Sequence, residues 1–494
     1  MVLRRILFLL TSVSGFIFLL HLQSCRQDDF DADPSLTLEF SADSLLFDTV
    51  FTTVGSSTRF FKVYNKHNSR IRISSVELAG GSASFFRINV DGRSGTHIRD
   101  VEIGPRDSLF VFVEVTVDPL GTDLPLVISD SVVFQVNNNV QDVKLVAWGQ
   151  DAHFIKPDIY DADLDVEYHL ITENTIWSGP KPWVIYGLLL IAPDVTLTIE
   201  EGTSVHLHHQ SAMIFTQRSS LVVDGSLDHP VTIQGDRLES GYQNLPGQWG
   251  YIWFSATSGV HDINYAVIKN GTYGIVMDSI ASFTEPTLRI RNTIIKNMDQ
   301  TGLELNGAWV EANNLVVANC GVHAIKMSFG GNYDFSHVTV ANYYSLPGAI
   351  RQTPSVSINN YFMDTLGVVH VRELEKVRFA NSIIYGSLQD ELFFDVFPDA
   401  SEANALFEYS LVRTVRQSHP EMFFENSLFN QQPRFLSVSE NDYRLQEDSP
   451  VIGQASLDIA ADVPLDILGN SRMERADMGA YQYYEIEDED DEED

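Results

Sequence analysis

The chain has 494 residues, of which 67 are acidic and 32 are basic, and its formal net charge is −35. This excess of carboxylates argues against nucleic-acid binding, because phosphate backbones are bound by stripes of lysine and arginine. A hydrophobic fraction of 44% excludes a wholly disordered chain, and the length suits roughly two to four domains.

The first residues have the pattern of an export signal. Two arginines precede an apolar stretch, residues 6–20, and residues 22–25 (Leu-Gln-Ser-Cys) resemble a bacterial lipobox. That resemblance implies that residues 1–24 are a signal peptide and that Cys25 is lipidated, which anchors the protein in a membrane. The alternative is an uncleaved anchor, although the apolar stretch is short for a spanning helix.

Residues 25–35 form an acidic linker after the lipidated cysteine. Within it, residues 26–31 (Arg-Gln-Asp-Asp-Phe-Asp) resemble the signal that sends some Gram-negative lipoproteins to the outer leaflet. The resemblance implies a lipid-anchored protein of the bacterial outer membrane, exposed at the cell surface. Acidic residues are common in linkers, so the pattern leaves the leaflet open.

Residues 36–150 contain short alternating runs that predict the strands of an immunoglobulin-like β-sandwich. Examples are residues 59–64, 109–117 and 140–147, with glycine and Asn/Asp turns between such runs. The order of its motifs resembles the sandwich domains of the abnormal-spindle and hydin type. The resemblance implies a binding or spacer module.

Residues 151–194 are a transition, and we expect them to cap the start of a solenoid that spans residues 195–436. The main evidence is a six-residue cassette whose first positions are 22, 23, 22 and 22 residues apart. A period of this length is typical of a solenoid, in which each coil buries its apolar face on the next. The cassettes are Asn292–Asn297, Asn314–Asn319, His337–Asn342, Asn359–Asp364 and Asn381–Gly386.

The end positions of the cassette suit sharp corners. The last position is always Asn, Asp or Gly, the residues that best tolerate left-handed or turn geometry. The first position is Asn in four cassettes and His337 in the other. We expect this column to form a ladder of stacked polar side chains that stabilises the coils.

The early coils carry motifs of a known family. Residues 197–205 (Leu-Thr-Ile-Glu-Glu-Gly-Thr-Ser-Val), 221–233 and 247–252 resemble the pectin-lyase-like, right-handed parallel β-helix family. The predicted fold class is therefore all-β, with an immunoglobulin-like β-sandwich followed by a right-handed parallel β-helix. The family includes lyases, hydrolases, epimerases, adhesins and inert scaffolds, so the resemblance leaves the activity open.

Residues 437–484 break the period and resemble the closing segment of secreted β-helix proteins. We expect them to cap the C-terminal end of the solenoid, with Asp466, Arg472 and Asp477 in an ion-paired anchor rather than a catalytic site. Residues 485–494 hold nine acids in ten positions and predict a disordered acidic tail.

Chemistry on such a solenoid needs side chains that point outward from one sheet. The alternation after each corner predicts that Glu304, Lys326 and Arg351 form such a column. They are our candidates for catalysis, with alternating charges that only stabilise neighbouring strands as the simpler alternative. Trp249 and Tyr242, which flank a long loop, are candidates for carbohydrate binding.

No motif predicts a metal or a cofactor. His206 and His208 share a strand face, but no third ligand follows at a recognisable spacing, and no compact carboxylate set suits Ca²⁺.

The first functional hypothesis is therefore a non-catalytic, surface-anchored protein that presents a solenoid face to a glycan or an envelope protein. The second is a polysaccharide-active enzyme, a lyase before a hydrolase. The third is a structural component of an envelope assembly.

Overall fold

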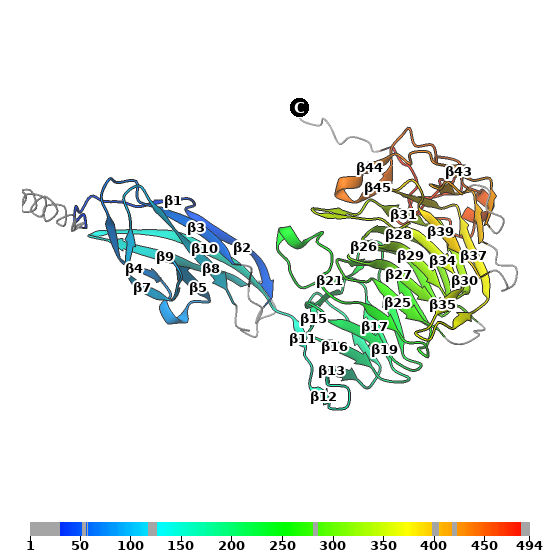
Figure 1. Cartoon of the computed structure of the whole chain (residues 1–494), viewed down its shortest axis with the longest axis horizontal. Coiled ribbons are helices and arrows are strands. Elements are labelled where there is room, and N and C mark those ends of the chain that lie inside the picture. Colours follow the sequence, from blue (N-terminus) through cyan, green and yellow to red (C-terminus); the bar gives the residue numbers. More distant parts are fainter. Residues whose placement is uncertain are drawn as a thin grey trace, which may run out of the picture. The chain divides into compact units, whose positions relative to one another are not determined.

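The computed structural model describes residues 30–51, 56, 58–116, 126–279, 285–397, 405–416 and 422–485. The predicted signal peptide, Cys25 and residues 486–494 of the acidic tail lie outside this part of the chain. The chain divides into two compact units, Met1–Gln150 and Asp151–Asp494 (Figure 1). Within the described residues, no helix is both long and apolar enough to cross a membrane.

The first unit is a β-sandwich of two five-stranded sheets, ordered β1-β3-β8-β5-β6 and β2-β10-β9-β4-β7. β2 and β10 run parallel, whereas the other neighbours are antiparallel. Alternate side chains of the strands enter a shared apolar core, as the sequence pattern predicts. The strands are β1 (Glu39–Phe40), β2 (Ser44–Phe51), β3 (Arg59–Tyr64), β4 (Ile71–Leu78), β5 (Phe86–Val90), β6 (Arg93–Gly95), β7 (His97–Ile103), β8 (Ser108–Val115), β9 (Leu126–Val136) and β10 (Asn139–Gln150), with a short 3-10 helix η2 (Gly81–Ala83).

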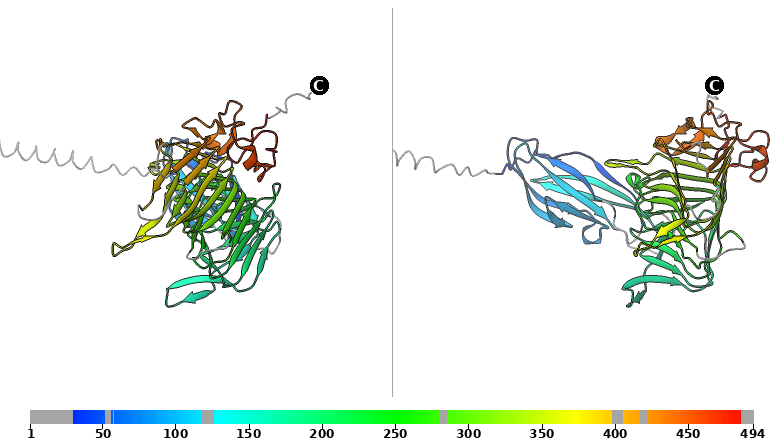
Figure 2. Two further views of the ribbon diagram at one scale, coloured as in Figure 1. Left: turned by 90° about the vertical axis from the view of Figure 1, so that its right-hand side faces the viewer. Right: turned by 45° about the vertical axis from the view of Figure 1, so that its right-hand side comes forward.

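The second unit is a solenoid whose coils stack in sequence order, from teal to orange in Figures 1 and 2. Its strands form three columns of parallel pairings, here named A, B and C, and each full coil contributes to all three. The all-β fold class, with a sandwich followed by a parallel-strand solenoid, is confirmed.

Column A contains β14 (Thr175–Trp177), β17 (Thr196–Glu200), β20 (Ser220–Asp224), β23 (His261–Asn264), the first halves of β26 (Leu288–Met298) and β28 (Trp309–Cys320), β30 (Gly331–Ser336), β37 (Leu374–Ala380), β40 (Ala405–Glu408) and β42 (Met422–Glu425). Column B contains β11 (His153–Ile155), β15 (Trp183–Ile185), β18 (Ser204–Leu207), β21 (Val231–Gly235), β24 (Ala266–Lys269), the second halves of β26 and β28, β31 (Thr339–Asn342), β38 (Ile383–Gly386), β41 (Leu411–Val412) and β43 (Leu428–Phe429). Column C contains β12 (Ile159–Asp161), β13 (Val166–Ile171), β16 (Leu188–Ile191), β19 (Ala212–Phe215), β22 (Ile252–Phe254), β25 (Ile275–Asp278), β27 (Thr301–Asn306), β29 (His323–Ser328), β34 (Val356–Asn359) and β39 (Leu392–Asp395), with β12 antiparallel to β13.

The corner between columns A and B is one residue in the left-handed region. Asparagine tolerates this geometry better than most residues, which explains its recurrence at the first cassette position. The predicted ladder forms in part: the Asn314 side-chain amide donates to Asn292 Oδ1 at 2.8 Å, and Asn381 Nδ2 lies 3.1 Å from His337 Nε2. The left-handed corner residues are Tyr265, Asn292, Asn314, His337, Asn381, Tyr409 and Asn426, with φ between 46° and 51°.

The fourth predicted cassette, Asn359–Asp364, is not a corner, and that prediction is wrong. Asn359 ends β34 in column C, and the next residues form a hairpin. The true corners His337 and Asn381 are 44 residues apart, because two hairpins are inserted into one coil. These hairpins are β32 (Ser345–Leu346) with β33 (Ala349–Ile350), and β35 (Tyr361–Met363) with β36 (Val369–Val371).

The interior of the solenoid is filled by inward side chains that stack on the same residue type in the next coil. Phenylalanines in register from β30 to β42 give ring-centroid distances of 4.8, 5.5 and 5.1 Å. Such stacking adds to the stability from burial alone. The rings belong to Phe335, Phe379, Phe407 and Phe424.

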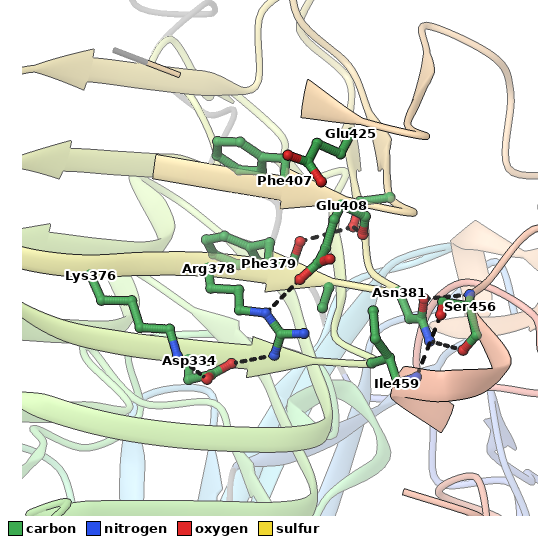
Figure 3. Close-up of polar contacts among 12 residues, drawn as sticks. Asp334, Lys376, Arg378, Phe379, Asn381, Phe407, Glu408, Glu425, Ser456 and Ile459 are labelled. Atoms are coloured by element: carbon green, nitrogen blue, oxygen red, sulfur yellow. Dashed lines mark hydrogen bonds and ion pairs between the residues drawn. The ribbon is translucent and has the colours of Figure 1, made fainter. Parts of the chain in front are cut away.

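The C-terminal segment, residues 433–484, lies along the side of column B, which differs from the end cap that we expected. Gly479 N donates to Asn381 O at 2.7 Å. Ser456 N donates to Asn381 Oδ1 at 2.8 Å (Figure 3). The segment covers an outward apolar surface that includes Val316, Ile383 and Leu411. Its elements are β44 (Phe435–Ser437), η4 (Val438–Glu440), β45 (Asp442–Leu445) and α2 (Leu457–Ala460).

The expected ion-paired anchor in this segment is also different. Arg472 is fully buried, but its guanidinium donates to backbone carbonyls, among them Leu465 O at 2.6 Å. Asp477 accepts from the backbone N–H groups of Gly453 and Tyr483, each at 2.7 Å. Arg472 and Asp477 therefore bind the backbone of the segment, and the ion pair of Asp477 is with Arg475, at 3.2 Å, rather than with Arg472.

Candidate functional site

The outward side of column C holds a groove of about 670 Å³. Strands β25, β27, β29 and β34 carry its floor, because residues that alternate with the buried ones point outward there. The groove is lined by Ala256, Asp278, Ser279, Asn306, Lys326, Ser328, Phe329, Asn359, Tyr361 and Phe362.

One row of the floor is a ladder of short polar side chains. Asp278, Asn306 and Ser328 are in register on consecutive strands. The Asn306 amide donates to Asp278 Oδ1 at 2.9 Å, and Trp253 Nε1 donates to Asp278 Oδ2 at 2.8 Å. Both carboxylate oxygens are thus held in place, so the row offers amide, hydroxyl and carboxylate groups in fixed positions.

The neighbouring row contains two of the three predicted catalytic residues. Glu304 and Lys326 are register partners, and Lys326 Nζ lies 2.7 Å from Glu304 Oε1. Both side chains are partly buried, and Lys326 lines the groove. The sequence prediction that these two side chains share one outward column is confirmed.

The third predicted residue, Arg351, lies elsewhere, and its placement in that column was wrong. The register partner of Lys326 in the next coil is Ser357. Arg351 follows the inserted hairpin β32–β33, is fully buried, and forms an ion pair with Glu391 at 2.6 Å. The hairpin shifts the strand register relative to the 22-residue period, and Arg351 therefore cannot reach a ligand on this face.

The hairpin β35–β36 forms an aromatic wall beside the floor. Phe362 stacks on its cross-strand partner His370 at 4.8 Å and meets Phe329 edge-to-face at 4.8 Å. Asp364 fixes the turn, because its Oδ2 lies 2.8 Å from His370 Nε2 and its Oδ1 accepts from Val368 N at 2.9 Å. These hydrogen bonds hold the pKa of the Asp364 carboxyl below its usual range.

Sequence reasoning missed this wall, although a signal for it exists. The run Asp364-Thr-Leu-Gly367 is a turn sequence between two short apolar strands. The overlapping residues 359–364 matched the spacing of the cassettes, and this match concealed the hairpin.

One polar group in the groove has no partner within the described residues. The Ser279 hydroxyl is buried, with the residue 4% exposed, and it makes no hydrogen bond there. The carbonyl of Ser279 accepts from Arg372 Nη1 at 2.6 Å, which fixes the backbone at this position. A buried hydroxyl without a partner is a group that a ligand can satisfy.

The two predicted carbohydrate-binding residues have different surroundings. Trp249 is fully buried, and its Nε1 donates to Lys269 O at 2.9 Å, so it is a core residue and that prediction is wrong. Tyr242 ends η3 (Ser240–Tyr242) and is partly exposed, with the Arg237 guanidinium 4.5 Å from its ring centroid. Its role stays a prediction.

The histidines near column B do not gather a metal site. His206 is buried, and burial lowers its pKa to about 4. His208 Nδ1 lies 2.6 Å from Asp236 Oδ2. No group of three or more His, Cys, Asp or Glu side chains in the described part of the chain is arranged to hold a metal ion.

Comparisons with known proteins add little. No protein-family model matches the chain, and no curated protein sequence matches it. A family 123 glycoside hydrolase from Clostridium perfringens, described for glycolipid glycan hydrolysis, is similar at 6% identity and a TM-score of 0.18, over 29% of this chain and 31% of that chain. A PapD-like (ASH) domain of human CEP192 is similar at 11% identity and a TM-score of 0.16, over 25% of this chain and 94% of that domain. TM-scores this low support no conclusion about fold or activity.

Proposed function

We propose that the protein is a surface lipoprotein of the bacterial outer membrane that binds a glycan chain in the groove on column C without cleaving it. The solenoid would be a pectin-lyase-like β-helix, and the sandwich would space it from the lipid anchor at Cys25. The observation that carries the proposal is the groove itself. A polar floor beside an aromatic wall suits sugars, whose hydroxyl groups and C–H faces need both kinds of contact.

The distribution of charge favours binding over catalysis. The Lys326 ammonium is paired with Glu304 at 2.7 Å, which suits a fixed hydrogen-bond donor better than a base. Asp278 accepts two hydrogen bonds from neighbouring side chains. Both carboxylates are therefore held by neighbouring side chains, which suits fixed contacts to a bound ligand.

A glycan array, followed by titration calorimetry with the best ligand, tests this proposal. Phe362→Ala removes an aromatic side chain that is 46% exposed beside the groove and should weaken binding about tenfold, or 1.4 kcal/mol. Met363→Ala, at the next position of the same strand and 63% exposed, is the control and should leave affinity unchanged. An array without ligands, or equal losses in the two variants, would contradict the proposal.

The position of Lys326 in the groove keeps a polysaccharide lyase as the second candidate. A lyase would release unsaturated products from uronate polysaccharides. Products of this reaction class absorb at about 235 nm. If the wild-type protein produces that absorbance and Lys326→Ala does not, the protein is a lyase rather than a binding protein. If the protein instead co-purifies with envelope proteins and binds no glycan, it is a structural component of an envelope assembly.

A further inference from the structure

Two lysines occupy neighbouring outward positions on column B, a different face from the groove. Lys269 and Lys296 are register partners on the parallel strands β24 and β26. The next partner of Lys296 is Ala318. Adjacent strands hold the two backbones about 4.8 Å apart, so two long cationic side chains rise side by side from a rigid sheet.

Several other cations on the solenoid are matched with carboxylates. In column A, Asp334 lies between Lys376 and Arg378, and Arg378 Nε lies 2.6 Å from Glu408 Oε1 (Figure 3). In column C, Lys326 faces Glu304. These rows alternate in sign, which stabilises neighbouring strands.

The lysine pair on column B differs from these rows. Neither ammonium lies within ion-pair distance of a carboxylate in the part of the chain that the structure describes. Both side chains are partly buried. Like charges directly opposite each other on a sheet are destabilising, and in a chain with 67 acidic and 32 basic residues an unmatched cationic pair is unexpected.

Burial lowers the pKa of both lysines, and the charge of one also lowers the pKa of the other. Burial lowers the pKa of Lys269. Burial, and then the nearby Lys269 charge, lowers the pKa of Lys296. The charged form of each lysine is thus disfavoured in the free protein, and a bound anion between them would remove that penalty.

The surroundings of the pair are fixed on one side by the loop after β21. Lys269 O accepts the indole N–H of the buried Trp249 at 2.9 Å, and Asn270 Nδ2 donates to Gln243 O at 3.0 Å. The strand ends that carry the two lysines are therefore anchored. A pre-organised backbone lowers the cost of binding.

We propose that Lys269 and Lys296 form an oxyanion-binding site that takes a sulfate, phosphate or carboxylate group. The anion lies between the two ammonium groups on the outward face of β24 and β26 and accepts charge-assisted hydrogen bonds from both. Its source is either a free ion or an acidic group of a glycan. The site does not depend on the groove of column C.

Residue-resolved acetylation tests the site on the purified full chain. The chain is treated with limiting acetic anhydride in sodium sulfate or in sodium chloride of the same ionic strength, and each lysine is quantified by peptide mass spectrometry. At four times the Kd for sulfate, about one fifth of the sites remain free, so acetylation of Lys269 and Lys296 should slow about fivefold. Lys376, which pairs with Asp334, is the internal control and should not change.

Variants give a second readout. Sulfate should raise the Tm of the wild-type chain above its value in chloride, and Lys269→Met/Lys296→Met should abolish that difference. Lys376→Met should retain it. Equal acetylation in both salts, or a sulfate effect that survives in the double variant, overturns the proposal.

Two further arms identify the occupant. Protection by a sulfated hexasaccharide at a far lower concentration than by inorganic sulfate assigns the anion to a glycan, whereas protection by inorganic sulfate alone assigns a free ion. A chain that ends at Glu485 lacks the acidic tail. If this truncation alone exposes both lysines to acetylation, the tail is the occupant and the ligand proposal fails.

Discussion

Arg351 and Glu391 form a bidentate ion pair in which both side chains are completely buried. Arg351 Nη2 donates to Glu391 Oε1 at 2.6 Å, and Nη1 donates to Oε2 at 2.8 Å. Glu391 also accepts from Leu388 N at 2.7 Å and from Ser355 N at 3.0 Å. The pair thus ties an inserted hairpin to the following coil.

Removing one partner of this pair should be strongly destabilising, because the other charge would stay buried without compensation. We expect Arg351→Met to lower the free energy of unfolding of the solenoid by about 3–5 kcal/mol, measured by urea denaturation followed by tryptophan fluorescence.

Arg218 offers a matched control, since it makes a bidentate pair with Asp194 at 2.5 and 2.6 Å on the surface. Arg218→Met should cost less than about 1 kcal/mol. Equal losses in the two variants would show that burial does not decide the contribution of the Arg351 pair.

His261 should make the solenoid sensitive to acid. It is fully buried, stacks on Phe254 at 3.6 Å, and accepts the Leu221 N–H on Nδ1 at 3.0 Å. Burial lowers the pKa of His261 to about 3. The unfolded chain therefore binds more protons than the folded chain between about pH 6.5 and pH 3, and stability falls as the pH drops through that window.

The size of this effect follows from the width of the window. Because His261 stays neutral in the folded chain, the free energy of unfolding should be about 2–3 kcal/mol lower at pH 4.5 than at pH 7. His261→Gln removes the titrating group, so the loss of stability between pH 7 and pH 4.5 should be smaller by about that amount. Urea denaturation at a series of pH values measures it, and parallel profiles for wild type and variant would contradict the assignment.

Lipidation can be tested independently of the fold. If Cys25 is acylated, metabolic labelling with a palmitate analogue should mark the protein, and Cys25→Ser should abolish the label and release the chain from membranes. Digestion of whole cells with an external protease then reports surface exposure. A labelled Cys25→Ser chain would mean that the anchor is elsewhere.

Local conformational preferences made much of the fold predictable. A left-handed corner selects asparagine, and Asn292 and Asn314 mark two successive corners. The alternation of buried and outward residues also placed Glu304 and Lys326 correctly beside each other. These features depend on residues near in sequence or on a constant coil length.

Insertions and non-local packing were not predictable in the same way. The hairpin before Arg351 changed which residues face outward, and Asn359–Asp364 imitated the cassette at the right spacing. Trp249 looked like a loop residue, but its ring packs against Gly271, which has no side chain to exclude it. The groove wall and the covering of column B depend on segments that no period encodes.

Substitution of Gly479 tests how closely the C-terminal segment packs against column B. Its φ is 94°, and an added Cβ would lie 2.6 Å from Thr339 Oγ1 and 2.9 Å from Ile383 Cδ1. Gly479→Ala should therefore destabilise the solenoid by roughly 2–4 kcal/mol, from both backbone strain and steric overlap. Gly348 has a φ of 84°, but nothing lies within 4 Å of an added Cβ, so a substitution there introduces backbone strain without steric overlap. Gly348→Ala should therefore lower the free energy of unfolding by about 1 kcal/mol.

The same variant should also expose the apolar surface beneath the segment. Val316, Ile383 and Leu411 are buried only because the C-terminal segment covers column B. In Gly479→Ala, the binding of a hydrophobic dye should rise before the main unfolding transition, whereas in Gly348→Ala it should follow that transition. If dye binding is unchanged in Gly479→Ala, the segment remains seated and the close approach of Gly479 to Thr339 is not what holds it there.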